Sequence, residues 1–152
     1  MFTLTVQPVT ADNWLAALAL DVFPHQQEFT PSVALSLAKA YIEPNGYCYD
    51  PFLVLVDGTA VGFYSYVHLL YDTTFCYLGG LLIDRNHQGK GYGRAVLHHF
   101  IAWLRQEHPE CSDLFLTVHP DNELALRLYT TLGFVKTGLM LDGEEELRLV
   151  LG

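Results

Sequence analysis

The chain of 152 residues is 51% hydrophobic and 16% charged, which excludes a disordered chain and fits one compact domain over residues 1–152. No apolar run reaches the roughly 18–20 residues that a membrane helix needs, so we expect no membrane partner. The formal net charge is −9, and residues 1–80 carry seven acids against a single base, Lys39. This balance disfavours nucleic acid as a partner and favours a small cationic molecule, although acidity that only aids solubility explains the charge equally well.

The first half of the chain predicts a strand, two helices and a β-hairpin. Alternating apolar and polar side chains indicate a half-buried strand, and apolar residues that follow capping signals indicate the helices. Asp57-Gly58, between two apolar runs, is the strongest hairpin signal in the chain. The predicted elements are a strand over 2–9, helices over 14–20 (capped by Asp12 or Asn13) and 32–42 (with Pro31 in its first turn), and strands over 51–56 and 60–70.

The second half of the chain alternates strands with helices. Two adjacent glycines, Gly79 and Gly80, lie inside a predicted strand over 74–83, where they indicate a β-bulge or the close approach of another backbone or a ligand. We expect a later helix to be capped by Asn122 and stopped by Gly133. The remaining predicted elements are an amphipathic helix over 94–108, a strand over 113–118, the helix over 122–133, and a closing hairpin over 134–151.

Residues 87–94, HQGKGYGR, lie between the 74–83 strand and the helix that follows it. Unpaired backbone N–H groups at such a helix N-terminus bind phosphate oxygens, and the glycines allow a close approach. A nucleotide P-loop would need Gly-Lys-Ser/Thr here, and a dinucleotide fingerprint would open the first βαβ unit of the chain. Neither condition holds, so another phosphate-bearing ligand is expected. A glycine-rich turn that only tightens strand-to-helix packing is the alternative.

Two motifs flank the 94–108 helix. In the first, Gln88, Gly91 and Gly93 match Q/R-x-x-G-x-G/A. The second spans residues 122–134 and matches N-x-x-A-x-x-L-Y-x-x-x-G-F. Together they resemble the GNAT superfamily of acyl-CoA N-acyltransferases, over essentially the whole chain. The segments TADNW, FPHQQEF, VGFYSY and LDGEEELRLVL are most similar to bacterial spermine/spermidine (polyamine) N-acetyltransferases.

This resemblance implies the fold and the cofactor. The expected fold is mixed α/β, with a central, mostly antiparallel sheet of about seven strands that splays at the cofactor site, and about four helices. The expected cofactor is acetyl-CoA, with its pantetheine arm along the open edge of the strand that carries Leu81, Leu82 and Ile83. A backbone N–H of Leu82 or a neighbour would polarise the thioester carbonyl. The resemblance places the pyrophosphate on the amides of Gln88, Gly89, Lys90, Gly91, Tyr92, Gly93 and Arg94.

Two residues of the second motif have implied roles beyond packing. Asn122 would contact the cofactor arm in addition to capping its helix. Tyr129 lies seven residues further on, on nearly the same helix face, and the resemblance implies that it contacts the cofactor and is the general acid for the leaving thiolate. A core tyrosine with a satisfied hydroxyl is the alternative role for Tyr129.

The acceptor side carries weaker signals. The resemblance implies that a small cationic amine such as spermidine or spermine attacks directly in a ternary complex, and no cysteine lies in a nucleophile motif that would require an acyl-enzyme. Glu28, in the loop between the first two helices, is the first candidate for binding the amine or accepting its proton. The further candidates for the acceptor site are Gln27, Asp50, Tyr71 and Asp72, each of which also fits a solvated surface position.

Several alternatives stay open at this point. The acceptor could instead be a protein N-terminus, an amino acid or an aminoglycoside, or the chain could be a non-catalytic acyl-CoA-binding module. Three cysteines without a Cys-x-x-Cys pair and seven histidines without ligand spacing predict no metal site and fit a reducing cytosol. The N-terminus lacks the basic region of a secretory signal, so we expect a cytoplasmic protein. The closing strands of this superfamily often pair between subunits, which implies a homodimer.

Overall fold

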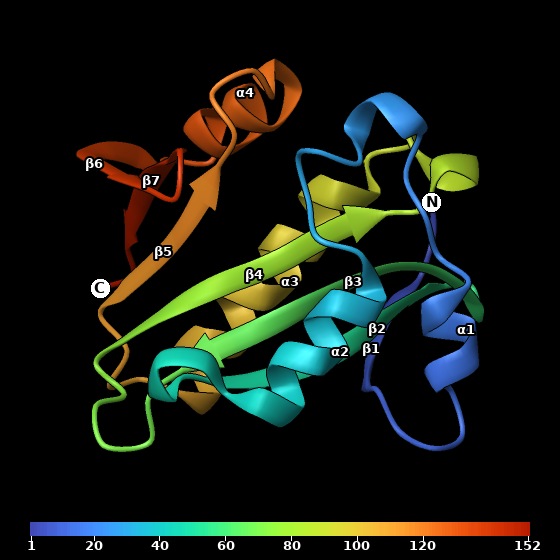
Figure 1. The fold of residues 1–152 in the computed structure, drawn as a ribbon, viewed down its shortest axis with the longest axis horizontal. Coiled ribbons are helices and arrows are strands. Elements are labelled where there is room, and N and C mark those ends of the chain that lie inside the picture. The colour runs from blue at the N-terminus through green and yellow to red at the C-terminus, as the bar shows by residue number, and fades with distance from the viewer.

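The computed structural model describes all 152 residues and contains one seven-stranded sheet in the order β1-β2-β3-β4-β5-β7-β6 (Figure 1). All neighbouring strands are antiparallel except β4 and β5, which are parallel. The strands are β1 Leu4–Pro8, β2 Cys48–Val56, β3 Thr59–His68, β4 Phe75–Ile83, β5 Asp113–Val118, β6 Val135–Leu141 and β7 Glu144–Val150. The four α-helices are α1 Trp14–Leu18, α2 Val33–Ile42, α3 Tyr92–Glu107 and α4 Glu123–Thr131.

These elements confirm the expected mixed α/β, mostly antiparallel fold. Both predicted hairpin turns adopt positive φ at their two central residues, with φ of 50° and 83° at Asp57 and Gly58 and 49° and 80° at Asp142 and Gly143. That geometry matches the twist of the flanking strands. None of the helices is long and apolar enough to cross a bilayer.

Two details at the helix starts differ from the prediction. Pro31 lies before the first turn of α2, because Ser32 is the N-cap and its side chain accepts a hydrogen bond from the Leu35 N–H at 3.1 Å. Asn13 is the N-cap residue of α1, but its Oδ1 atom accepts from the Thr10 N–H at 2.7 Å rather than from the helix. A side-chain cap therefore marks the start of α2, whereas α1 begins without one.

The sheet separates two hydrophobic cores. Along β2 the side chains alternate, so that Val54 packs toward α3 while Leu53 packs toward α1 and α2. The larger core lies under α3 and includes the fully buried Phe100, and the smaller one joins α1, α2 and Leu82 of β4. Figure 1 shows α3 behind the sheet and α2 in front of it. Burial of both faces holds β4 rigidly in the middle of the molecule.

The sheet opens between β4 and β5. Their pairing extends only from Phe75–Asp113 to Tyr77–Phe115, and beyond it the two strands diverge, as Figure 1 shows. On its other side, β4 has a register shift against β3 that places two residues, Gly80 and Leu81, between the Ser65–Gly79 and Phe63–Leu82 pairs. The predicted bulge is therefore present at Gly80 and Leu81, with Gly79 still paired to Ser65, and the splay expected of the sheet is confirmed.

Gly80 is the bulge residue at which the surroundings leave little room for a Cβ atom. Its φ is +57°, and a Cβ at this position would lie 2.8 Å from Ser36 Oγ and 3.5 Å from Pro31 Cγ. We predict that Gly80→Ala lowers the free energy of unfolding by more than Gly46→Ala, measured by urea denaturation. Gly46 has φ +80° but open space around its Cβ position, so it reports the left-handed backbone cost alone, roughly 1–2 kcal/mol. Equal losses in the two variants would show that the contact with α2 is unimportant.

Candidate active site

A cavity of about 660 Å³ occupies the gap between β4 and β5. One wall comes from β4 and its bulge, including Gly79, Gly80, Leu81, Leu82 and Ile83. The opposite wall comes from β5 and α4, and includes Leu116, Thr117, Val118, Asn122, Ala125, Leu128 and Tyr129. Since β4 lacks a strand partner on its β5 side along this stretch, the backbone groups on that side are open to a ligand that lies in the gap.

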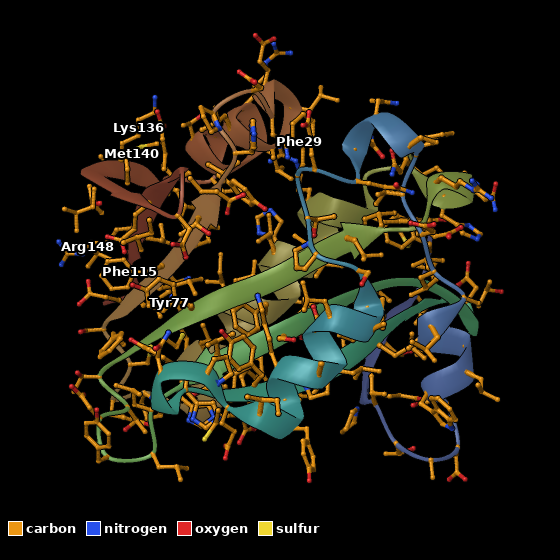
Figure 2. All side chains as sticks on the ribbon, viewed as in Figure 1. Phe29, Tyr77, Phe115, Lys136, Met140 and Arg148 are labelled. Carbon is orange, nitrogen blue, oxygen red and sulfur yellow. The ribbon has the colours of Figure 1, made fainter.

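The loop between α1 and α2 bridges the two walls. Phe29, from this loop, lines the cavity, and its ring centroid lies 5.1 Å from that of His119 at the end of β5. Thr30, the next residue, donates a hydrogen bond from Oγ1 to the carbonyl oxygen of Leu81 at 3.3 Å. Figure 2 shows Phe29 reaching from this loop toward α4. The loop thus covers one side of the cavity while it is fixed to β4.

The glycine loop forms the outer end of the cavity. None of the backbone N–H groups of residues 88–94 donates a hydrogen bond within the chain. Gly89 and Gly91 have φ of +76° and +84°, with open space where a Cβ would lie. Gly91 is the N-cap of α3 but supplies no side-chain cap, and the first turn of α3 contains no acidic residue. The exposed amides and the positive end of α3 therefore form a site for an anion.

Gln88 fixes this loop to the rest of the site. Its Nε2 atom donates to the carbonyl oxygen of Ile83 at 2.9 Å and to Gln26 Oε1 at 2.9 Å, and Gln26 Nε2 donates back to Gln88 Oε1 at 3.0 Å. These bonds tie the loop to the end of β4 and to the α1–α2 segment. The lining residues from the loop are His87, Gln88, Gly89, Gly91, Tyr92 and Gly93, whereas the exposed Lys90 and Arg94 lie outside the cavity.

Asn122 and Tyr129 meet the cavity from α4. Asn122 caps the helix, since its Oδ1 accepts from the Ala125 N–H at 3.3 Å. The Tyr129 ring packs against Phe134 with a centroid distance of 5.7 Å; Tyr129 also lines the cavity, and its hydroxyl makes no hydrogen bond within the chain. Burial, and after it the negative charge of Glu144, raises the pKa of Tyr129 to about 12. The phenol therefore keeps its proton at neutral pH and is free to donate it.

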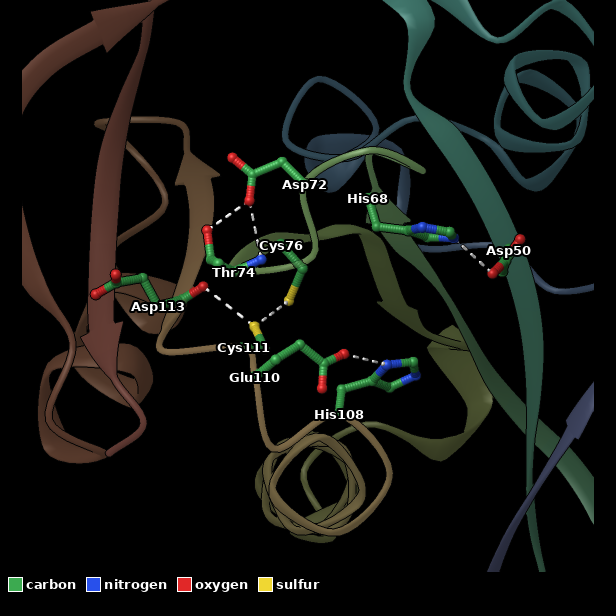
Figure 3. A network of polar contacts seen from close by, with 9 residues as sticks. All are labelled: Asp50, His68, Asp72, Thr74, Cys76, His108, Glu110, Cys111 and Asp113. Carbon is green, nitrogen blue, oxygen red and sulfur yellow. Dashed lines mark hydrogen bonds and ion pairs between the residues drawn. The ribbon is translucent and has the colours of Figure 1, made fainter.

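The predicted acceptor-site residues lie outside this cavity. Glu28 is exposed and is not part of its wall, and Gln27 lines a smaller neighbouring pocket beside Asp21 and Ser32. Asp50 lies 2.9 Å from His68 Nε2, and Asp72 accepts hydrogen bonds from Thr74 (Figure 3). Tyr71 is 87% exposed. Their roles toward an acceptor stay predictions: none of them lines the main cavity, and only Gln27 shares a pocket with a predicted cofactor-site residue, Leu82.

Other polar residues line the cavity without having been predicted. Glu144, at the start of β7, accepts a hydrogen bond from Thr117 Oγ1 at 2.9 Å. Lys39 of α2 lines the cavity and lies 5.9 Å from the centre of the Tyr49 ring. Tyr77 of β4 donates to Glu146 Oε2 at 2.9 Å, and Figure 2 shows it beside Phe115. The alternation of side chains along a strand predicts that Glu144 and Glu146 share one face of β7. It does not predict that Glu144 reaches this cavity.

The cysteines lie away from the cavity. Cys76 and Cys111 are buried, with their sulfur atoms 3.6 Å apart (Figure 3), and Cys48 is half-buried on β2. None of the three lines the cavity. No group of three or more histidine, cysteine or acidic residues is arranged to hold a metal ion.

Comparison with known proteins identifies the family. The signature of the acetyltransferase (GNAT) family matches residues 13–134. The chain belongs to the GNAT family. It is therefore an acyl-CoA-dependent N-acetyltransferase, as the two motifs predicted.

Relatives named as polyamine acetyltransferases align with nearly the whole chain. The chain is 30% identical over 149 residues to the spermine/spermidine N(1)-acetyltransferase of Bacillus subtilis strain 168. The aligned region covers 94% of this chain and 95% of the relative. Two solved structures share the fold. The spermidine N-acetyltransferase of Vibrio cholerae, in complex with CoA and spermine, has a TM-score of 0.71 at 17% identity and covers 97% and 95% of the two chains. The ribosomal-protein-S18-alanine N-acetyltransferase of Escherichia coli has a TM-score of 0.70 at 22% identity and covers 99% and 95%.

The residues of the cavity fit an acyl-CoA. The free amides of the glycine loop suit a pyrophosphate, because a Cβ at Gly89 or Gly91 would project into open space that a ligand can enter. The open edge of β4 suits an amide-containing arm, which can pair with it as a further strand would. The cavity of this GNAT protein thus joins an anion site, at the glycine loop, to the open edge of β4, and these features suit the pyrophosphate and the amide-containing arm of an acyl-CoA.

Two glycines of the loop allow a matched test of this site. Gly91→Ala would force a side chain into left-handed backbone, at a cost of roughly 1–2 kcal/mol, whereas the φ of Gly93 is not left-handed and its Cβ would contact Leu128 Cδ2 at an ordinary 3.7 Å. We predict that Gly91→Ala weakens coenzyme A binding about tenfold or more, the equivalent of about 1.4 kcal/mol. Gly93→Ala should bind within about twofold of the parent protein, since it adds no such strain. Calorimetric titration measures both, and equal affinities for all three proteins would remove the loop from the site.

Proposed function

We propose that this GNAT protein transfers an acetyl group from acetyl-CoA to a primary amine of a polyamine such as spermidine or spermine. The observation that carries the proposal is the 30% identity, over 94% of the chain, to a spermine/spermidine N(1)-acetyltransferase. The acidic first half of the chain supports a cationic acceptor. The free thiols of all three cysteines support a cytoplasmic location.

Each part of the cavity has a role in this reaction. Acetyl-CoA, when bound, supplies the activated thioester. The amides of residues 88–94 bind the pyrophosphate, and Asn122 contacts the cofactor arm. The bulge at Gly80 and Leu81 turns a backbone N–H, of Leu82 or a neighbour, toward the carbonyl oxygen that gains charge. Tyr129 donates its proton to the departing sulfur.

Direct attack by the amine suits this cavity better than an acyl-cysteine. All three cysteines lie outside the wall, so none can reach an acyl group held beside Tyr129. The hydroxyl of Tyr129 has no competing hydrogen bond within the chain, and its raised pKa keeps it protonated. A proton donor and an open approach for the amine are what a ternary complex needs.

Removal of the phenol tests the proposed acid. We predict that Tyr129→Phe lowers kcat about 100-fold, the usual size of a lost general acid, and leaves coenzyme A affinity unchanged. The matched control is Tyr41→Phe, because Tyr41 is 86% exposed on α2 and does not line the cavity. Steady-state kinetics with thiol detection measures both variants. A Tyr129→Phe protein with the parent kcat would remove Tyr129 from the acid role.

Lys39 favours a second candidate acceptor. It is the only lysine or arginine on the cavity wall, and a fixed ammonium repels a polycation while it attracts a carboxylate. An amine that also carries a carboxylate, such as an amino acid, would place its carboxylate on Lys39. This acceptor uses the same cofactor and the same acid.

A substrate panel with a Lys39 variant separates the two acceptors. For a polyamine, Lys39→Met should raise kcat/KM several-fold, because one repulsive charge is removed from the cavity. For an amino acid, the same substitution should lower kcat/KM about tenfold or more, because its carboxylate loses a charged partner. Lys136→Met is the control, since Lys136 pairs with Glu145 on the outer hairpin. Turnover of amino acids without turnover of spermidine or spermine in the parent protein would overturn the polyamine proposal.

A further inference from the structure

We infer that Glu144 binds the ammonium group of the acceptor and accepts its proton before the amine attacks. The inference rests on the proposed transfer to an amine but does not depend on which amine it is. The sequence favoured Glu28 for this role, whereas Glu144 is the only aspartate or glutamate on the wall of the cavity. An alkylammonium has no lone pair for attack, so the reaction needs a group that removes one proton.

The hydrogen bonds of Glu144 leave one of its oxygens available. Thr117 Oγ1, on the diverging part of β5, donates to Glu144 Oε1 at 2.9 Å, while Oε2 accepts no hydrogen bond within the chain. The neighbouring acids are already occupied. Glu145 pairs with Lys136 Nζ at 3.1 Å, and Glu146 accepts from Tyr77 and Thr137, one bond on each oxygen at 2.9 Å. Glu144 is thus oriented by Thr117 and keeps Oε2 free for an ammonium.

Glu144, from β7, and Tyr129, from α4, both line the cavity and would have complementary roles in the reaction. Burial and, after it, the negative charge of Glu144 raise the pKa of Tyr129, so the carboxylate favours the protonated phenol. A carboxylate that accepts a proton and a phenol that keeps one are the two partners that this reaction needs. The other titratable groups that line the cavity are Lys39 of α2, His87 beside the loop, and Tyr47, Tyr49, Tyr77 and Tyr92.

The protons balance with these two groups. The ammonium loses two protons in becoming an amide. The first passes to Glu144 Oε2 and then to bulk water. The second leaves the nitrogen as the new C–N bond forms and the C–S bond breaks, and it replaces the proton that Tyr129 Oη gives to the departing sulfur. Both side chains are thereby restored.

The pH dependence of Glu144→Gln tests this inference. In the parent protein, kcat/KM should be nearly constant from pH 6.5 to 8.5, because the enzyme takes up the ammonium form that predominates. In the variant only the free amine can react, so kcat/KM should rise about tenfold per pH unit in that range, well below the ordinary amine pKa near 10. At pH 7 we expect a loss of about 100- to 1000-fold.

Controls and a binding readout accompany the kinetics. Glu145→Gln changes the adjacent carboxylate, which pairs with Lys136 away from the cavity, and should retain the parent rate and profile. Thr117→Val keeps Glu144 but removes its orienting bond, and should lower kcat/KM several-fold without the steep pH slope. Calorimetric titration of the coenzyme A complex with the best acceptor should show at least about tenfold weaker binding in Glu144→Gln, from loss of a charge-assisted contact. Melting curves check that each variant folds.

The outcomes separate this inference from the proposed function. An unchanged Glu144→Gln rate, or a loss that is the same at every pH, would overturn the role of Glu144 while acetyl transfer by the parent protein still stands. The steep pH slope in Glu28→Gln, with a flat profile in Glu144→Gln, would return the role to Glu28. A parent protein that acetylates no amine would overturn the proposed function itself, and the role of Glu144 with it.

Discussion

The parting of β4 from β5 after the Tyr77–Phe115 pair is the constraint on which the site depends. Two strands in the middle of a sheet would normally satisfy each other's backbone groups, and a parted pair leaves those groups without partners. The molecule tolerates this because both sides of the gap are held from outside it. On one side β3 and the α1–α2 core hold β4, and on the other β7 pairs along the whole of β5, from Asp113–Val150 to Val118–Glu145.

Glycine backbone geometry sets the shape of this opening at both ends. At the bulge, Gly80 lies so close to Ser36 that no side chain fits between β4 and α2. At the loop, Gly89 and Gly91 have nothing near their Cβ positions, so their left-handed backbone serves to turn the amides outward rather than to relieve crowding. The first glycine allows the helix to lie close to the sheet, and the other two expose donors to a ligand.

The cofactor half of the site could be predicted from sequence because its signals are local. Gln88, the loop glycines, Asn122 and Tyr129 lie within two short motifs, and each motif forms one strand-to-helix or turn-to-helix junction. Glu144 and Lys39 could not be predicted in the same way. Glu144 reaches the cavity only because β7 is inserted between β5 and β6, and Lys39 only because α2 lies over β2 and β3. Both placements depend on long-range packing, which single-sequence patterns do not report.

The division of the site into a cofactor half and an acceptor half also explains why the fold does not specify the acceptor. An enzyme that acetylates a ribosomal protein and one that acetylates spermidine share this fold at TM-scores of 0.70 and 0.71. The elements proposed to meet the cofactor are β4, α3, α4 and the loop between β4 and α3. The side chains that would meet an amine come instead from α2, the α1–α2 loop and the start of β7. These segments carry Lys39, Phe29 and Glu144, whose side chains make no hydrogen bond to β4 and can differ without removing one. Under the proposed function, acceptor choice therefore depends on a few side chains placed around this opening, and the carboxylate of Glu144 and the ammonium of Lys39 are the two charges on the cavity wall that would distinguish one amine from another.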